Sequence, residues 1–273
     1  MDLDSALTLL AVEPAAPLDV AELALHLALD EYPSLDVEAN LAELDAMAHE
    51  AKRYVRGDLA ARVAGLCRYL FHDMGFHGNT REYYDPANSY FHLVLERRTG
   101  IPITLGAVVM AVGRRVGLDV EGVGLPGHFV VKVEDHGREI VVDPFHGGRM
   151  LSHLDCENLV RQVTGREFAV TTESLQALPL GFMVLRMLAN LKAIYLKTGD
   201  SARAIRVMER MQQLRPGDPL QRRDLGTNWL HAGKPGKAID HLAAYLAALP
   251  DADDADVIRL LLKDARAAVA SWN

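Results

Sequence analysis

The stretch RRTGIPITLGAVVMAVGRRVGLDVEGVGLPGHFVVKVEDHGREIVVDPFHGG, residues 97–148, decides the fold of this chain. It opens with a turn at Gly100-Ile101-Pro102 and continues as an apolar segment. Apolar side chains recur there at steps of three, four and seven, at Leu105, Val108, Val109, Val112 and Val116. This spacing predicts a helix with one face in a core, with Pro102 in its first turn and Gly117 as its stop.

Three strand-like segments follow the predicted helix, at residues 120–125, 129–134 and 139–142. The last two flank Asp135-His136-Gly137-Arg138, which is typical of a hairpin turn. His128 opens the first arm and Asp143 closes the second. A two-residue loop at 135–136 pairs them directly, and a loop at 136–137 makes them diagonal neighbours on one face. A three-residue loop separates them, so two of three registers join an imidazole and a carboxylate.

Three blocks, NSYFHLVLERRTGIPITLG, VEGVGLPGHF and VVDPFHGG, resemble the bacterial SirB family. That family joins a transglutaminase-like domain, related to the papain-like thiol hydrolases, to tetratricopeptide repeats. The resemblance covers most of residues 30–270. It implies an α+β fold, in which a papain/transglutaminase-like core of helices and a small antiparallel sheet precedes an all-α repeat region.

The chain departs from the enzymes of this superfamily at the start of the core helix. Those enzymes place a nucleophilic cysteine there, backed by a histidine and an aspartate. Here the region reads Ile101-Pro102-Ile103-Thr104, while His128 and Asp143 match the other two positions. Because a thiol mechanism needs a thiolate, we interpret the pair as a remnant catalytic dyad in a fold that has lost its thiol chemistry.

Four polar residues are further candidates for a cleft beside His128, namely Asn88, Ser89, His92 and Thr104. Asn88 or Ser89 also suits the N-cap of a helix over residues 90–99, so the functional and structural interpretations both stay open. Thr104 lies at the start of the core helix and offers a hydroxyl in place of the missing thiol. A threonine within the chain is a weak nucleophile, because no terminal amine activates it.

Cys67 and Cys156 are the chain's only cysteines. Cys67 falls in the apolar pattern of a helix, and Asp155 and Glu157 beside Cys156 would raise its thiol pKa, so neither suits a nucleophile. A low cysteine count, no secretory signal and no apolar run long enough for a membrane span predict a cytoplasmic protein. The net charge of −8 argues against nucleic-acid binding.

From residue 182 onward the pattern is helical and repeats every 34 residues, the tetratricopeptide period. Matched pairs at this spacing are Leu191 and Leu225, Tyr195 and Trp229, Leu196 and Leu230, Gly199 and Gly233, Ala204 and Ala238, Ile205 and Ile239, and Pro216 and Pro250. We predict a transglutaminase-like domain over residues 1–178. Residues 179–273 then hold two repeats and a capping helix at 256–272.

These features favour a non-enzymatic interaction protein, with a regulatory role, that binds a protein or peptide. The alternative is a hydrolase or acyl-transfer enzyme that uses the His128–Asp143 dyad with water or Thr104 as nucleophile. A metal site at His128, Asp143 and His146, with His92 as a further ligand, is the least favoured hypothesis. No ligand pair there has a standard local spacing, so we expect no metal and no cofactor.

Overall fold

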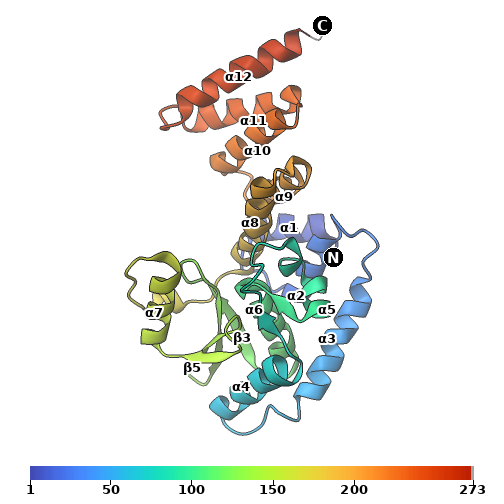
Figure 1. The fold of residues 1–273 in the computed structure, drawn as a ribbon, viewed down its shortest axis with the longest axis vertical. Helices are drawn as coiled ribbons and strands as arrows, with labels where there is room; N and C mark the ends of the chain where they lie inside the picture. Colours follow the sequence, from blue (N-terminus) through green and yellow to red (C-terminus); the bar gives the residue numbers. More distant parts are fainter. Residues whose placement is uncertain (272–273) are drawn as a thin grey trace. The chain divides into compact units, whose positions relative to one another are not determined.

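A computed structural model describes residues 1–271, and its elements fall into two units (Figure 1). Residues 1–6 and 14–187 form the first unit, and residues 7–13 with the chain from Leu188 onward form the second. Helices α1 (Leu3–Val12) and α8 (Leu180–Thr198) contribute to both. The domain boundary expected between residues 178 and 179 stays a prediction.

The first unit is a mixture of helices and short strands, in agreement with the predicted α+β class. Its helices between α1 and α8 are α2 (Val20–Ala28), α3 (Val37–Ala51), α4 (Leu59–Cys67), α5 (Phe91–Arg97), α6 (Pro102–Arg115) and α7 (His153–Thr164). Shorter helical segments are the π-helix η1 (Arg68–Asp73) and the 3-10 helices η2 (Pro86–Asn88) and η3 (Glu173–Leu175). The strands are β1 (His77–Gly78), β2 (Thr99–Gly100), β3 (Asp119–Val123), β4 (Val130–Asp135), β5 (Arg138–Asp143) and β6 (Arg149–Leu151).

The four strands β3 to β6 form an antiparallel sheet in chain order, and β1 pairs with β2 in parallel. Asp135 pairs with Arg138, so His136 and Gly137 form the two-residue loop of the hairpin. Both have positive φ, 50° and 78°, as a type I′ turn requires. The second of the three registers considered from the sequence is therefore the observed one.

Helix α6 packs directly on one face of the sheet because glycine at two positions lets the backbones approach. A Cβ at Gly106 would lie 2.5 Å from the Phe129 ring, and one at Gly113 would lie 2.6 Å from Val120. Val131 and Val133 point to this side, in the larger core. Val130 and Val141 point to the other face, in a smaller core with α7.

Helices α2, α3 and α4, which precede the sheet, each begin after an aspartate. Asp19, Asp36 and Asp58 accept backbone hydrogen bonds at the starts of α2, α3 and α4. The helix that contains Cys67 in its apolar pattern becomes π-helical directly after this residue. The expected cap of α5 is wrong, because Tyr90 occupies the N-cap and neither Asn88 nor Ser89 caps the helix.

The second unit is all helical and has the predicted 34-residue period. After α8 it contains α9 (Ser201–Leu214), α10 (Pro219–His231), α11 (Pro235–Ala248) and α12 (Ala255–Ala270). α12 follows the two repeats, as expected for the last helix, although Trp272 lies outside the described residues. Within residues 1–271 we find no helix with both the length and the apolar composition that crossing a membrane requires.

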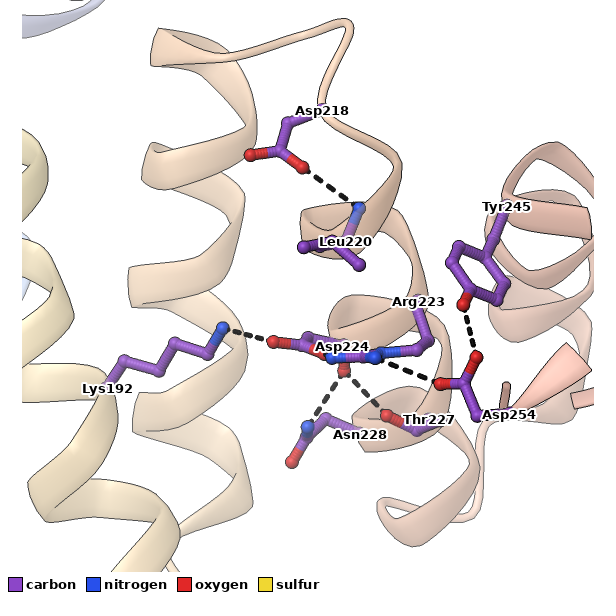
Figure 2. Close-up of polar contacts among 9 residues, drawn as sticks. All are labelled: Lys192, Asp218, Leu220, Arg223, Asp224, Thr227, Asn228, Tyr245 and Asp254. Atoms are coloured by element: carbon purple, nitrogen blue, oxygen red, sulfur yellow. Dashed lines mark hydrogen bonds and ion pairs between the residues drawn. The ribbon is translucent and has the colours of Figure 1, made fainter. Parts of the chain in front are cut away.

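A chain of polar contacts joins α8, α10, α11 and the residue before α12 (Figure 2). Lys192 of α8 contacts Asp224 of α10, whose carboxylate also accepts from the Arg223 guanidinium at 2.7 and 2.9 Å. Arg223 continues to Asp254 at 2.9 Å, and Asp254 accepts a hydrogen bond from the Tyr245 hydroxyl. Although partial burial opposes the charge, Asp224 and Asp254 raise the pKa of Arg223 above its ordinary value. Asp224 is thus the centre of the network.

We expect Asp224→Asn to lower the free energy of unfolding of the second unit by about 2 kcal/mol, because two cations lose a charged hydrogen-bond partner. Both tryptophans of the chain, Trp229 and Trp272, follow residue 187, so urea unfolding followed by tryptophan fluorescence reports on this part. Asp253→Asn is the control, since the exposed Asp253 has no hydrogen bond or ion pair among the described residues. Equal stability of the two variants would contradict the assigned role of Asp224.

Candidate functional site

His128 and Asp143 meet at the open end of the central hairpin. The Nε2 atom of His128 lies 3.0 Å from Oδ1 of Asp143. Only 4% of the His128 side chain and 2% of the Asp143 side chain are exposed. His128 precedes β4 in a turn closed by its own N–H on the Leu125 carbonyl, 3.2 Å away. The hairpin register therefore places an imidazole beside a carboxylate in a buried setting.

The carboxylate of Asp143 accepts hydrogen bonds from both imidazoles and from the backbone. Oδ1 accepts the N–H groups of Phe145 at 3.0 Å and His146 at 3.3 Å, in addition to His128. Burial alone would raise the pKa of Asp143, but the hydrogen bonds and charges of His128 and His146 outweigh it and hold the pKa below its ordinary value. Asp143 is therefore an ionised group at neutral pH.

His146 completes the cluster from the other side of Asp143. Its Nδ1 atom lies 2.6 Å from Oδ2 of Asp143, and its ring stacks on His128 at 5.8 Å and 23°. Gly147 and Gly148 follow with positive φ, and the N–H of Gly148 returns to the Asp143 carbonyl at 2.9 Å. From the sequence, His146 is a candidate only as a metal ligand, and its spacing of three from Asp143 is the signal for this second contact.

Arg186 of α8 supports His128 from its backbone side, a contact that sequence reasoning missed. Its guanidinium donates to the His128 carbonyl at 2.7 Å and to the Leu125 carbonyl at 3.4 Å. Burial lowers the pKa of Arg186 from its ordinary value, although the side chain stays a cation. No local sequence pattern predicts this hydrogen bond, because Arg186 lies 58 residues from His128 in the sequence.

Aromatic rings border the cluster. Phe145 lies edge-on to His128 at 6.1 Å and to His146 at 5.2 Å, and Tyr83 lies against Phe145 at 5.9 Å. Burial raises the pKa of Tyr83, so its phenol stays protonated at neutral pH. The polar cluster thus has an apolar wall on the side of Phe145.

Asn88 and Thr104 brace the chain next to α6. The buried Asn88 amide donates to the carbonyls of Glu82 and Tyr83, at 2.8 and 3.2 Å. The Thr104 hydroxyl donates to the Asn88 carbonyl at 2.7 Å and accepts the Ile101 N–H at 3.1 Å. Both side chains are thereby tied to the backbone near the start of α6.

Ser89 and His92, the other two cleft candidates, have no hydrogen bond, ion pair or ring contact with His128 or Asp143 in the described part of the chain. The His92 ring packs against Tyr32 and Tyr90, at 4.6 and 6.3 Å, and burial lowers its pKa. The Ser89 hydroxyl and Nδ1 of His92 are buried without a hydrogen-bond partner among the described residues. No hydrogen bond or ring contact joins His92 to His128 in residues 1–271.

The two thiols are buried and protonated at neutral pH. Burial raises the pKa of Cys67 to about 12. The pKa of Cys156 rises to about 11, first through burial and then through the charges of Asp155, Asp143 and Glu157. The acidic neighbours expected to raise this pKa therefore do so, but burial contributes more.

A cleft of about 330 Å³ opens beside Asp143 and His146. Its remaining lining comes from β6 and α7, through Arg149, Leu151, Asp155, Asn158, Leu159, Arg161 and Gln162. His128, Asp143 and His146 each offer one potential metal-ligand atom, and these atoms lie within 4.8 Å of one another. His92 is not part of this group. The arrangement can orient an imidazole, bind a proton or hold a cation.

We expect Asp143→Asn to lower the free energy of unfolding around the hairpin by about 3 kcal/mol at pH 7, because it removes the buried carboxylate that accepts hydrogen bonds from His128 and His146. The folded-state pKa of Asp143 is depressed, so its stabilisation is present above the unfolded pKa and is lost as pH falls through the folded value. The difference from wild type should therefore narrow below about pH 4.

Hydrogen exchange of the β4 and β5 amides, read by mass spectrometry between pH 7 and 3.5, measures this difference. Asp119→Asn is the matched control, because the side chain of the exposed Asp119 has no hydrogen bond or ion pair among the described residues. A pH-independent difference between wild type and Asp143→Asn would contradict the ionised state of Asp143.

Comparisons with known proteins agree with this architecture. Residues 38–189 match the transglutaminase-like superfamily, and residues 191–263 match the tetratricopeptide repeat. A UPF0162 protein of Xylella fastidiosa strain 9a5c is 36% identical over 250 residues, which are 88% of this chain and 88% of that protein. A UPF0162 protein of Vibrio cholerae is 29% identical over 198 residues, covering 72% and 71% of the two chains.

A more distant similarity is confined to part of the chain. Human F-box only protein 21 is 32% identical over 124 residues, which are 42% of this chain and 20% of that protein. No solved structure matches the chain. The predicted order of domains is confirmed. The chain belongs to the transglutaminase-like superfamily and, within it, to the SirB-like UPF0162 family, in which tetratricopeptide repeats follow the transglutaminase-like domain.

Proposed function

We propose that this chain is a cytoplasmic, regulatory protein-interaction module whose transglutaminase-like domain performs no thiol-dependent acyl transfer. The observation that carries the proposal is that neither thiol of the chain is available as a nucleophile. Cys67 and Cys156 are buried, protonated thiols. A thiol of that kind attacks poorly, because the thiolate is the reactive form.

The placement of Asp143 and Thr104 supports the same conclusion. Asp143 shares a sheet face with Val141, which packs in the smaller core beside α7. Thr104 belongs to α6, which covers the opposite face. The Thr104 hydroxyl donates a hydrogen bond to the backbone carbonyl of Asn88. A threonine nucleophile would have to give up that hydrogen bond, and no hydrogen bond joins Thr104 to His128 within residues 1–271.

The repeats support a binding role. Tetratricopeptide repeats generally mediate protein–protein contacts, and stacked helical repeats present extended binding surfaces. On α12, Val257 and Leu260 are 58% and 62% exposed and lie three residues apart, on one side of the helix. We propose that these two side chains contact a protein or peptide partner.

A second candidate is a hydrolase in which His128, oriented by Asp143, activates water. The observation that favours it is the ionised Asp143 beside a cleft that it shares with His146. An imidazole paired with a carboxylate is a suitable general base. The resulting reaction would be independent of both cysteines.

An amide-hydrolysis and transamidation assay on purified chain separates these functions. We expect no turnover above the buffer blank, either for wild type or for a Cys67→Ala, Cys156→Ala variant, because neither thiol is available. Turnover that disappears in the double-cysteine variant would contradict the proposal. Turnover that survives it but disappears in His128→Ala would favour the water-activating hydrolase.

Affinity capture from a lysate of the source organism, with quantitative mass spectrometry, tests the binding role. We expect a Val257→Asp, Leu260→Asp variant to lose at least tenfold of the captured partner, because charge on an apolar contact opposes its desolvation. Leu154→Asp on α7 is the control, since Leu154 is 64% exposed and matches Leu260. A partner that is lost only in His128→Ala would instead place binding at the dyad.

A further inference from the structure

We propose that His128, Asp143 and His146 bind a divalent transition-metal ion of the zinc type. A catalytic dyad needs one imidazole on its carboxylate, whereas Asp143 holds two, at 3.0 and 2.6 Å. One potential ligand atom from each residue lies within 4.8 Å of the other two. Metal binding goes beyond the proposed interaction role, because it requires no partner protein.

The donor set indicates which class of ion fits. Two imidazole nitrogens and one carboxylate oxygen suit zinc, with bonds of about 2.0 to 2.2 Å, whereas magnesium and calcium prefer oxygen ligands. In a tetrahedral site with such bonds, donor atoms lie about 3.4 Å apart. The contacts at 3.0 and 2.6 Å therefore need to lengthen by less than about 1 Å, and a ligand pair at the 4.8 Å limit needs to shorten by about 1.4 Å. His146 can supply that movement, because its side chain is 51% exposed.

Hydrogen bonds from neighbouring groups fix the orientation of Asp143 and the backbone of His128, as the ligands of a metal site require. Backbone N–H groups of Phe145 and His146 bond Oδ1 of Asp143 and orient its carboxylate. The Arg186 guanidinium donates a hydrogen bond to the backbone carbonyl of His128 and so fixes the backbone at this ligand. Groups that orient the ligands in this manner strengthen metal affinity.

The adjacent cleft provides the entry path and the remaining coordination position. Asp143 and His146 both line it, so an ion bound between them would meet solvent or a small ligand on that side. The two arginines of the lining are already paired, Arg149 with Asp155 and Arg161 with Glu167. Their charges are thereby partly offset and oppose a cation less.

Equilibrium dialysis of the untagged full chain against zinc chloride, after removal of metal with a chelator, tests the proposal. Metal content is read by mass spectrometry, and unfolding temperature is read in parallel. We expect one zinc ion per chain for wild type and a rise in Tm of about 5 °C or more at zinc 100-fold above Kd. His146→Asn should weaken binding at least tenfold and abolish the rise.

His146→Asn keeps an N–H donor close to the position of Nδ1 but supplies an amide, which is a poor zinc ligand. His136→Asn is the control, because His136 is 97% exposed and asparagine suits its positive φ in the hairpin turn. It should bind zinc as wild type does. Less than one zinc per wild-type chain, or equal binding by wild type and His146→Asn, would overturn the proposal. Neither result bears on the partner capture, which is measured without added metal.

Discussion

The two-residue turn at His136-Gly137 sets the register of the central hairpin, and the polar cluster depends on that register. Both turn residues have positive φ, which matches the right-handed twist of the flanking strands. A shift by one residue would move the side chain of Asp143 to the opposite face of the sheet, away from His128. In the observed register, the Asp143 carboxylate also accepts a hydrogen bond from the backbone N–H of Phe145, at the start of the next loop. A local backbone preference therefore determines where a buried charge finds its partners.

The sheet separates two environments. On one face, Gly106 and Gly113 allow α6 to approach so closely that aromatic and valine side chains fill the interface. On the other face, α7 covers a smaller core, and Asp143 lies at its edge. The close approach of α6 leaves little room for polar chemistry on its side, since Ile101, Ile103 and Thr104 are each at most 3% exposed. The cleft lies instead between β6, α7 and the loop of His146.

The sequence was informative wherever a feature is local or periodic. The spacing of valines predicts α6, the turn residues limit the hairpin to three registers, and the 34-residue period predicts the repeats. It was least informative where distant segments meet. Arg186 contacts His128 across 58 residues, and Asn88 supports a loop through carbonyls that no side-chain pattern reveals. The choice among the three registers also needed the backbone, because an Asp-His-Gly-Arg turn is compatible with each.

Loss of a thiol at the start of α6 and loss of the His128–Asp143 dyad would have different effects on the stability of the fold. A neutral thiol at the start of α6 can be replaced by apolar side chains, because no buried charge loses its partner. Ile101 and Ile103 fill that region and contribute to the larger core. Removal of Asp143 or His128, in contrast, leaves buried polar groups without a hydrogen-bond partner, which costs about 1 to 3 kcal/mol for each group. A well-formed His128–Asp143 hydrogen bond is therefore required for stability whether or not a reaction takes place beside it, so the bond alone is no evidence of catalysis.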